Sequence, residues 1–158
     1  MVYFQWRRPL KLADIPNKDM FAAERRSSCP IAMIDDENQE AVVSRLEYLG
    51  FSINEFRDIK NIHAIAAYPI IASDIKGVGK LIGAHTEGAF LVKEIRRGYP
   101  DKYIISYSSA AYDLNYTEYW KDCDKSILRP DDIAQWVQIF DAAIKEMADP
   151  VLRPKFND

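Results

Sequence analysis

The stretch "IAMIDDENQEAVVSRLEYLG" (residues 31–50) combines an apolar run, three adjacent acidic residues and a segment with helical periodicity. The apolar residues 31–34 suit a short strand that is buried on both faces. After the acidic residues, apolar side chains recur at helical spacing, and Gly50 follows as a C-cap. The stretch therefore predicts a strand followed by a helix, which is the repeating unit of α/β proteins.

The acidic residues Asp35, Asp36 and Glu37 lie at the junction between this strand and this helix. One interpretation is that they only favour the start of the helix, because acidic side chains stabilise helix N-termini. The other is that the adjacent carboxylates share a cation, since each would otherwise raise the pKa of its neighbours. What the rest of the chain places near Asp35 and Asp36 decides between the two.

From Cys29 onward, strand-like and helix-like segments alternate along the chain. Four more strands are expected at 51–56, 68–74, 102–109 and 125–128. Helices are expected at 58–67, 87–100, 115–123 and 129–147. Five strand–helix units predict one parallel sheet with helices on both faces.

The length of 158 residues suits a single domain. We expect an N-terminal extension at 1–28, a domain at 29–148 and a short tail at 149–158. The extension has two prolines and no sustained period, and within it residues 2–6 could pair as an edge strand or residues 18–26 could form a short helix.

The composition is that of an ordinary globular protein, with 21 Lys and Arg against 24 Asp and Glu. The net charge of −3 gives no electrostatic reason to expect a nucleic-acid partner. Two cysteines, Cys29 and Cys123, with no secretory signal before them, favour core thiols in a reducing cytoplasm. No apolar run is long enough for a transmembrane helix.

Reactive side chains follow four of the five predicted strands. They are Asp35 and Asp36, Asp74, Ser108 or Ser109, and Arg129. In an open parallel sheet, ligands bind at the carboxyl ends of the strands, so these side chains should converge. Gathered carboxylates favour a divalent cation such as Mg²⁺, and an aspartate beside it can act as a nucleophile toward phosphorus. Ser108 and Arg129 could donate hydrogen bonds to a transferred phosphoryl group.

This ordered series resembles the response regulator receiver domain of two-component signalling, the CheY-like family. The matching segments are "IAMIDDE", "PIIASD", "EGAFLVKEIRRGYP", "YIISYSS" and "KSILRP". The resemblance covers residues 29–147 and implies a flavodoxin-like α/β fold, a five-stranded parallel sheet of order 2-1-3-4-5 with helices on both faces. It also implies a stand-alone receiver that signals through partner binding.

Carried over to this chain, the resemblance implies that Asp74 accepts a phosphoryl group in a Mg²⁺-dependent reaction. Asp35, Asp36, Asp74 and the backbone carbonyl of Lys76 would bind the metal, and Ser108 would be the hydroxyl that moves toward the phosphoryl group. The donor would be a histidine kinase or a phosphotransfer protein. A downstream protein would bind the face formed by segments 115–123, 125–128 and 129–147, and a homodimer is possible.

Three features depart from the family pattern. Arg129 stands where the family has a lysine before the proline, and a planar guanidinium does not replace an ammonium conservatively. Ser126 stands where the family usually has the aromatic residue that reports phosphorylation. The loop at 75–87 is longer than usual and lacks the common proline.

Two rival functions stay open. The first is a non-phosphorylated interaction module on the same fold, which Arg129 and Ser126 favour. Its function would lie in the extension, the long loop or the aromatic residues of 112–120. The second is a small hydrolase, for which the sequence offers no convincing general base. Any enzymatic activity of a receiver would be limited to self-phosphorylation from a phosphodonor and autodephosphorylation.

Overall fold

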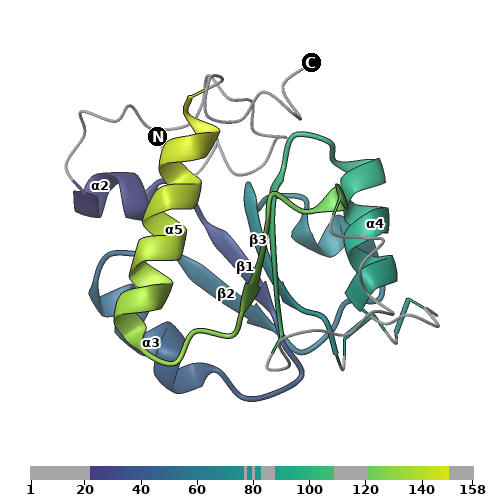
Figure 1. The fold of residues 1–158 in the computed structure, drawn as a ribbon, viewed down its shortest axis with the longest axis horizontal. Coiled ribbons are helices and arrows are strands. Elements are labelled where there is room, and N and C mark those ends of the chain that lie inside the picture. The colour runs from purple at the N-terminus through teal and green to yellow at the C-terminus, as the bar shows by residue number, and fades with distance from the viewer. Residues whose placement is uncertain (1–21, 77, 80, 83–87, 109–120, 150–158) are drawn as a thin grey trace.

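The computed structural model describes residues 22–76, 78, 79, 81, 82, 88–108 and 121–149 (Figure 1). Its centre is a parallel sheet in the order β2-β1-β3-β4-β5, which confirms the expected fold. The strands are β1 (Ile31–Ile34), β2 (Ile53–Phe56), β3 (Ile70–Asp74), β4 (Tyr103–Ser108) and β5 (Lys125–Leu128). All five run toward the lower end of the molecule in Figure 1.

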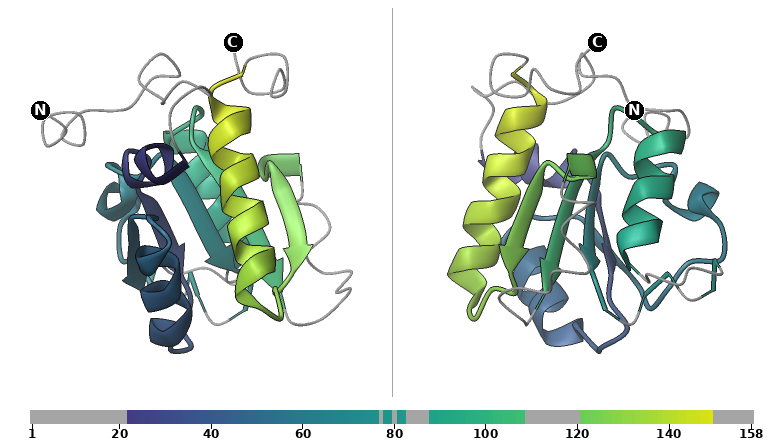
Figure 2. Two further views of the ribbon diagram at one scale, coloured as in Figure 1. Left: turned by 90° about the vertical axis from the view of Figure 1, so that its left-hand side faces the viewer. Right: turned by 45° about the vertical axis from the view of Figure 1, so that its right-hand side comes forward.

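The central strands are buried on both faces, as their continuous apolar sequences predict. Every residue of β1, β3 and β4 is buried, whereas the edge strands β2 and β5 expose part of their side chains. Helices α3 (Glu40–Tyr48) and α5 (Ile133–Met147) cover one face of the sheet, and α4 (Gly88–Gly98) covers the other (Figure 2). Each face therefore has its own apolar core.

The C-terminus of α3 has the geometry of a Schellman motif. Gly50 has a φ of +101°, and its N–H donates to the carbonyl of Glu47 at 3.0 Å. The N–H of Phe51 donates to the carbonyl of Leu46 at 3.1 Å, and both of these side chains are buried in the same core. Gly50 thus ends the helix as the sequence predicts, because glycine adopts this left-handed conformation without a Cβ clash.

The helix expected at 58–67 is shorter and tighter than predicted. Only η2 (Ile62–Ile65) forms, as a 3₁₀ turn, and the side chain of Asn61 caps it by accepting from the N–H of His63. The segment holds three isoleucines and ends two residues before Pro69, so it offers little room for a regular α-helix.

Within the expected extension, helix α2 (Ala22–Ser27) overlaps the second half of the range 18–26, where a short helix was expected, and ends one residue after it. The expected edge strand at 2–6 lies outside the described residues, as do residues 150–158 of the tail and most of the helix expected at 115–123. Cys29 and Cys123 are buried free thiols, as predicted. Among the described helices, none is long and apolar enough to cross a membrane.

Candidate functional site

The register of the sheet brings the predicted strand-end residues to one place. Asp74 is the last residue of β3 and lies opposite Tyr107 of β4. Asp35 directly follows β1, whose last residue lies opposite Ser73. Arg129 directly follows β5, and its N–H donates to the carbonyl of Ser108 at 2.8 Å. Four strand ends that are distant in sequence therefore meet at the carboxyl edge of the sheet.

Three carboxylates form the acidic part of the site. Asp35, Asp36 and Asp74 each offer an oxygen, and these oxygens lie within 4.8 Å of one another. Asp35 and Asp74 are buried, with 3% and 6% of their surfaces exposed, whereas Asp36 is exposed. The predicted convergence of these carboxylates is thus present in the structure.

The guanidinium of Arg129 bridges the two buried carboxylates. Its Nη1 donates to Oδ2 of Asp35 at 2.9 Å, and its Nη2 donates to Oδ2 of Asp74 at 2.7 Å. The exposed carboxylate of Glu37 lies 3.9 Å from Nη1. Because one planar cation contacts two anions, the pairs are charge-assisted and directionally fixed.

Tyr107 is part of the site although the sequence did not single it out. Its buried hydroxyl donates to Oδ2 of Asp35 at 2.8 Å, and the guanidinium of Arg129 lies 5.2 Å from its ring centroid. Burial and the neighbouring Asp35 carboxylate raise the pKa of Tyr107 well above its usual value, so the hydroxyl keeps its proton and acts as a donor. The one available signal was a tyrosine next to the last residue of a buried strand.

Asp74 has a perturbed acidity. Burial raises its pKa to about 6, and the negative charge of Asp35 adds to this effect. The N–H of Lys76, which donates to Oδ1 of Asp74 at 3.2 Å, and the charge of Arg129 act in the opposite direction. Asp74 is therefore a carboxylate whose ionised form the protein stabilises only in part, which is a frequent property of functional carboxylates.

The other predicted site residues lie at the margin of this group. Lys76 is exposed and contributes its backbone N–H to Asp74. Ser108 is the last residue of β4 and is buried, and Ser109 lies outside the described residues. Ser126, which departs from the family pattern, is exposed on β5, and its hydroxyl lies 3.1 Å from that of Ser106 on the neighbouring strand.

The acidic pair does not start the following helix. Helix α3 begins at Glu40 and its N-cap is Gln39, so Asp35 and Asp36 lie outside the first turn. Oδ1 of Asp35 instead accepts from the N–H of Glu37 at 3.0 Å, which closes a turn directly after β1. This geometry favours the interpretation in which the pair belongs to a site rather than to a helix terminus.

The side chain of Asp58 holds the long loop after β3, a contact that the sequence did not indicate. Oδ1 of Asp58 accepts from the N–H of Gly79 at 2.7 Å, and Oδ2 accepts from the N–H of Leu81 at 3.1 Å. Val78, directly before Gly79, is fully buried. Asp58 therefore anchors the described part of this loop to the segment after β2.

The donor set fits a divalent hard cation. Three carboxylates and one guanidinium give the group a formal charge of −2 when Asp74 is ionised, and oxygen is the ligand that Mg²⁺ prefers. Asp35, Asp36 and Asp74 would hold such an ion, and the turn at Lys76 lies beside them. The same group without Arg129 would have a larger excess of negative charge.

No protein-family model matches the sequence, and no curated protein matches it. Several solved structures have a similar fold at low sequence identity. A CheY-like response regulator receiver domain protein from Methanospirillum hungatei is 16% identical, with a TM-score of 0.60, and the match covers 75% of this chain and 95% of that one. A response regulator from Thermotoga maritima is 17% identical, with a TM-score of 0.56 and coverage of 74% and 98%.

A response regulator protein from Burkholderia pseudomallei, solved with a phosphorylated aspartic acid, calcium ion and citrate, is 18% identical, with a TM-score of 0.58. That match covers 75% of this chain and 69% of the other. These similarities agree with the parallel strand order observed in this chain. The chain therefore has the flavodoxin-like fold of response regulator receiver domains.

Proposed function

We propose that the protein is a stand-alone receiver that accepts a phosphoryl group on Asp74 in a Mg²⁺-dependent reaction and signals by a change in partner binding. The main support is the group of three carboxylates, Asp35, Asp36 and Asp74, within 4.8 Å at the carboxyl edge of the sheet. The fold shared with receiver domains supports the same function.

In the proposed reaction, a carboxylate oxygen of Asp74 attacks the phosphorus of a phosphohistidine. An O–P bond forms while the P–N bond breaks, and the imidazole leaves with the electron pair. A bound Mg²⁺ would neutralise charge on the transferred phosphoryl oxygens. Arg129 lies beside Asp74 and is a donor for those oxygens, and the hydroxyl of Ser108 is a second donor at the end of β4.

The proposed partners follow from this reaction. A histidine kinase or a phosphotransfer protein in the cytoplasm would supply the phosphoryl group. A downstream protein would bind the face that includes β5 and α5, and a homodimer is also possible. Phosphorylation would bias a two-state arrangement of the loops after β4 and β5 and so change the affinity for that protein.

Acetyl phosphate labelling tests the proposed reaction. With Mg²⁺ present, intact-mass analysis of the wild-type protein should show the mass of one added phosphoryl group. The Asp74→Asn variant should stay unlabelled because it lacks the nucleophilic oxygen. Asp36→Asn should be labelled more slowly, since it removes a metal ligand but keeps the acceptor. Equal labelling of wild type and Asp74→Asn would reject Asp74 as the acceptor.

A second function, a non-phosphorylated interaction module on the same fold, is favoured by the ion pairs of Arg129 with Asp35 and Asp74. In that case Arg129 compensates part of the negative charge of the acidic group, which has a structural role. Beryllofluoride with Mg²⁺ distinguishes the two functions, because only a working acceptor site should bind this phosphoryl mimic and shift the NMR signals around Ser108. An unchanged spectrum at millimolar Mg²⁺ would favour the interaction module.

A further inference from the structure

We propose that Arg129 is the resident counter-cation of the acidic site and competes with the divalent ion for Asp74. The inference rests on the proposed function, because it concerns how the same site is loaded. It assigns Arg129 a second role besides contact with the phosphoryl group. In the metal-free protein Arg129 holds Asp35 and Asp74 together, and loading of the site requires that it release or share Asp74.

Arg129 occupies oxygens that a metal would use. Oδ2 of Asp74 accepts from Nη2 of Arg129 at 2.7 Å, and Oδ1 accepts from the N–H of Lys76. Oδ2 of Asp35 accepts from both Arg129 and the hydroxyl of Tyr107. Both oxygens of Asp74 thus have donors, so a cation that enters must displace one or share its oxygen.

The surrounding structure holds the Arg129 guanidinium in the position in which it competes with a metal ion. The backbone of Arg129 is fixed by its N–H bond to the carbonyl of Ser108 and by the buried Pro130 that follows. Its guanidinium lies over the ring of Tyr107, and only 20% of its side chain is exposed. A positioned cation loses little conformational entropy when it pairs, which strengthens its competition with a metal ion.

This arrangement depends on the forked guanidinium of arginine. Two nitrogens of one planar group reach two different carboxylates, at 2.9 Å and 2.7 Å. An ammonium has its charge on a single atom and lacks this forked geometry, so a lysine would pair less well with both acids at once. Because arginine stands before Pro130 where the family has lysine, one side chain bridges Asp35 and Asp74 in the metal-free site.

Magnesium titration of three proteins tests the inference. Wild type, Arg129→Gln and Arg57→Gln are freed of metal with a chelator, dialysed and titrated with MgCl₂ alone in a calorimeter. Arg129→Gln removes the competing charge, so it should bind Mg²⁺ at least about tenfold more tightly than wild type. Arg57 is a nearby exposed arginine whose Nη1 donates to the backbone carbonyl of Asp36 at 3.4 Å and which forms no ion pair with the carboxylates of the site. Its variant should stay within about twofold of wild type.

The thermal midpoint gives a second readout that does not depend on phosphorylation. Without metal, Arg129→Gln should melt at a lower temperature than wild type because Asp35 and Asp74 lose their shared counter-ion. Saturating Mg²⁺ should raise its midpoint more than it raises that of wild type. If Arg129→Gln does not fold without metal, Arg129→Lys replaces it, and it should bind Mg²⁺ more tightly than wild type.

The outcomes separate this inference from the function on which it rests. Equal Mg²⁺ affinities of wild type and the folded Arg129 variant, or weaker binding by the variant, would overturn the competition and leave the acceptor function standing. An absence of binding in all three proteins would overturn both. Tighter binding by Arg129→Gln but not by Arg57→Gln would support the competition.

Discussion

At the scale of single residues, the site is a balance of buried charges. Asp35 and Asp74 are removed from water, and the charge of Asp35 makes the ionisation of Asp74 less favourable. Arg129 and the proton of the Tyr107 hydroxyl compensate for part of this cost. The pKa of Asp74 nevertheless stays above the ordinary value of an aspartate, and this property has a measurable consequence.

We expect Asp74 to make the metal-free protein less stable as the pH rises. Its pKa is raised from 3.8 to about 6 in the folded state, so the fold favours the protonated form. Its stabilising contribution is fully present below pH 3.8 and is lost as the pH rises through 6. Relative to Asp74→Asn, the free energy of unfolding of wild type should fall by about 3 kcal/mol across this range.

Urea unfolding of wild type and Asp74→Asn in chelator, at intervals between pH 4 and 7, measures this difference. An NMR titration of the Asp74 carboxyl carbon gives the pKa directly. A difference between the two proteins that stays constant with pH would contradict the expectation.

At the scale of elements, the start of α4 packs directly on the end of β3. The N–H of Gly88 donates to the carbonyl of Ile75 at 2.9 Å. A Cβ at Gly88 would lie 2.6 Å from the carbonyl oxygens of Asp74 and Ile75. Glycine at this position therefore allows the helix to approach the backbone that carries the acceptor, and a side chain there would push the two elements apart.

Gly88→Ala should reduce stability by about 1–3 kcal/mol, because the new methyl group meets backbone atoms that cannot move aside. It should also weaken Mg²⁺ binding, since the turn after Asp74 is displaced. Gly98→Ala at the other end of α4 is the control, because its methyl group meets only the tip of the Ile62 side chain. Urea unfolding should place this control within about 1 kcal/mol of wild type. Equal losses in the two variants would show that the contact with β3 is unimportant.

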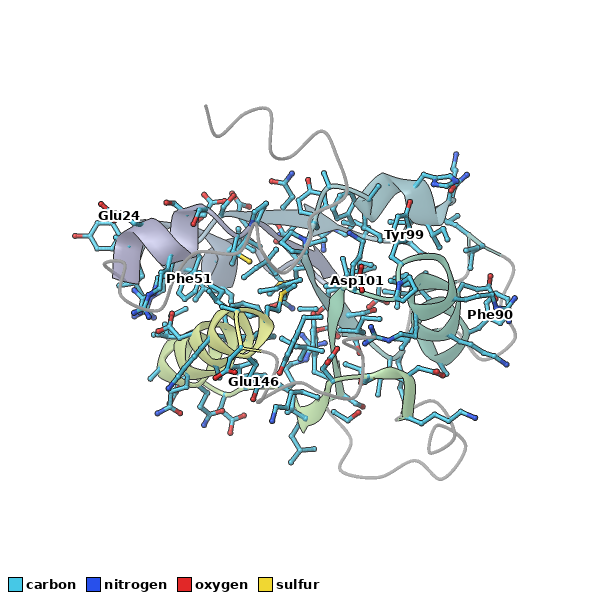
Figure 3. All side chains as sticks on the ribbon, turned by 90° about the horizontal axis from the view of Figure 1, so that it is seen from above. Glu24, Phe51, Phe90, Tyr99, Asp101 and Glu146 are labelled. Carbon is cyan, nitrogen blue, oxygen red and sulfur yellow. The ribbon has the colours of Figure 1, made fainter. Side chains whose placement is uncertain are left out.

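At the scale of the whole molecule, the sheet lies between two layers of helices, and α2 adds to the layer that contains α5. Figure 3 shows Phe51 between α2 and α5, and Phe90 on the outer side of α4. Arg26 of α2 forms a two-bond ion pair with Asp141 of α5, at 2.8 and 2.7 Å. Its guanidinium also lies 4.7 Å from the ring centroid of Phe51. The last part of the expected extension is thus attached to the domain.

Arg26→Ala should lower the free energy of unfolding by about 1–2 kcal/mol, because a partly buried ion pair and a cation–π contact are lost together. Hydrogen exchange at the amides of α2 should become faster. Arg97→Ala is the matched control, since Arg97 pairs with Glu94 on an exposed surface. That control should change stability by less than about 0.5 kcal/mol. Slow exchange of α2 in the Arg26 variant would show that other contacts hold the helix.

The sequence alone determined the alternation of strands and helices, the end of α3 at Gly50, and the convergence of Asp35, Asp36 and Asp74. Burial leaves a periodic pattern in the sequence, and the carboxyl ends of parallel strands share one edge. The positions of reactive residues directly after predicted strands were therefore enough to predict that these residues meet at one edge of the sheet. The short 3₁₀ turn at 62–65 was not predicted, because a weak periodicity over ten residues does not decide between helix types.

Only the tertiary structure decided which side chains pair within the site. Arg129 and Asp35 are 94 residues apart, and Tyr107 and Asp35 are 72 apart. Their contacts depend on strand register and on the length and direction of side chains, which periodicity does not encode. Whether Arg129 faces solvent, a phosphoryl group or the two carboxylates is a matter of a few ångströms. The packed sheet sets that distance by fixing β1, β3, β4 and β5 side by side.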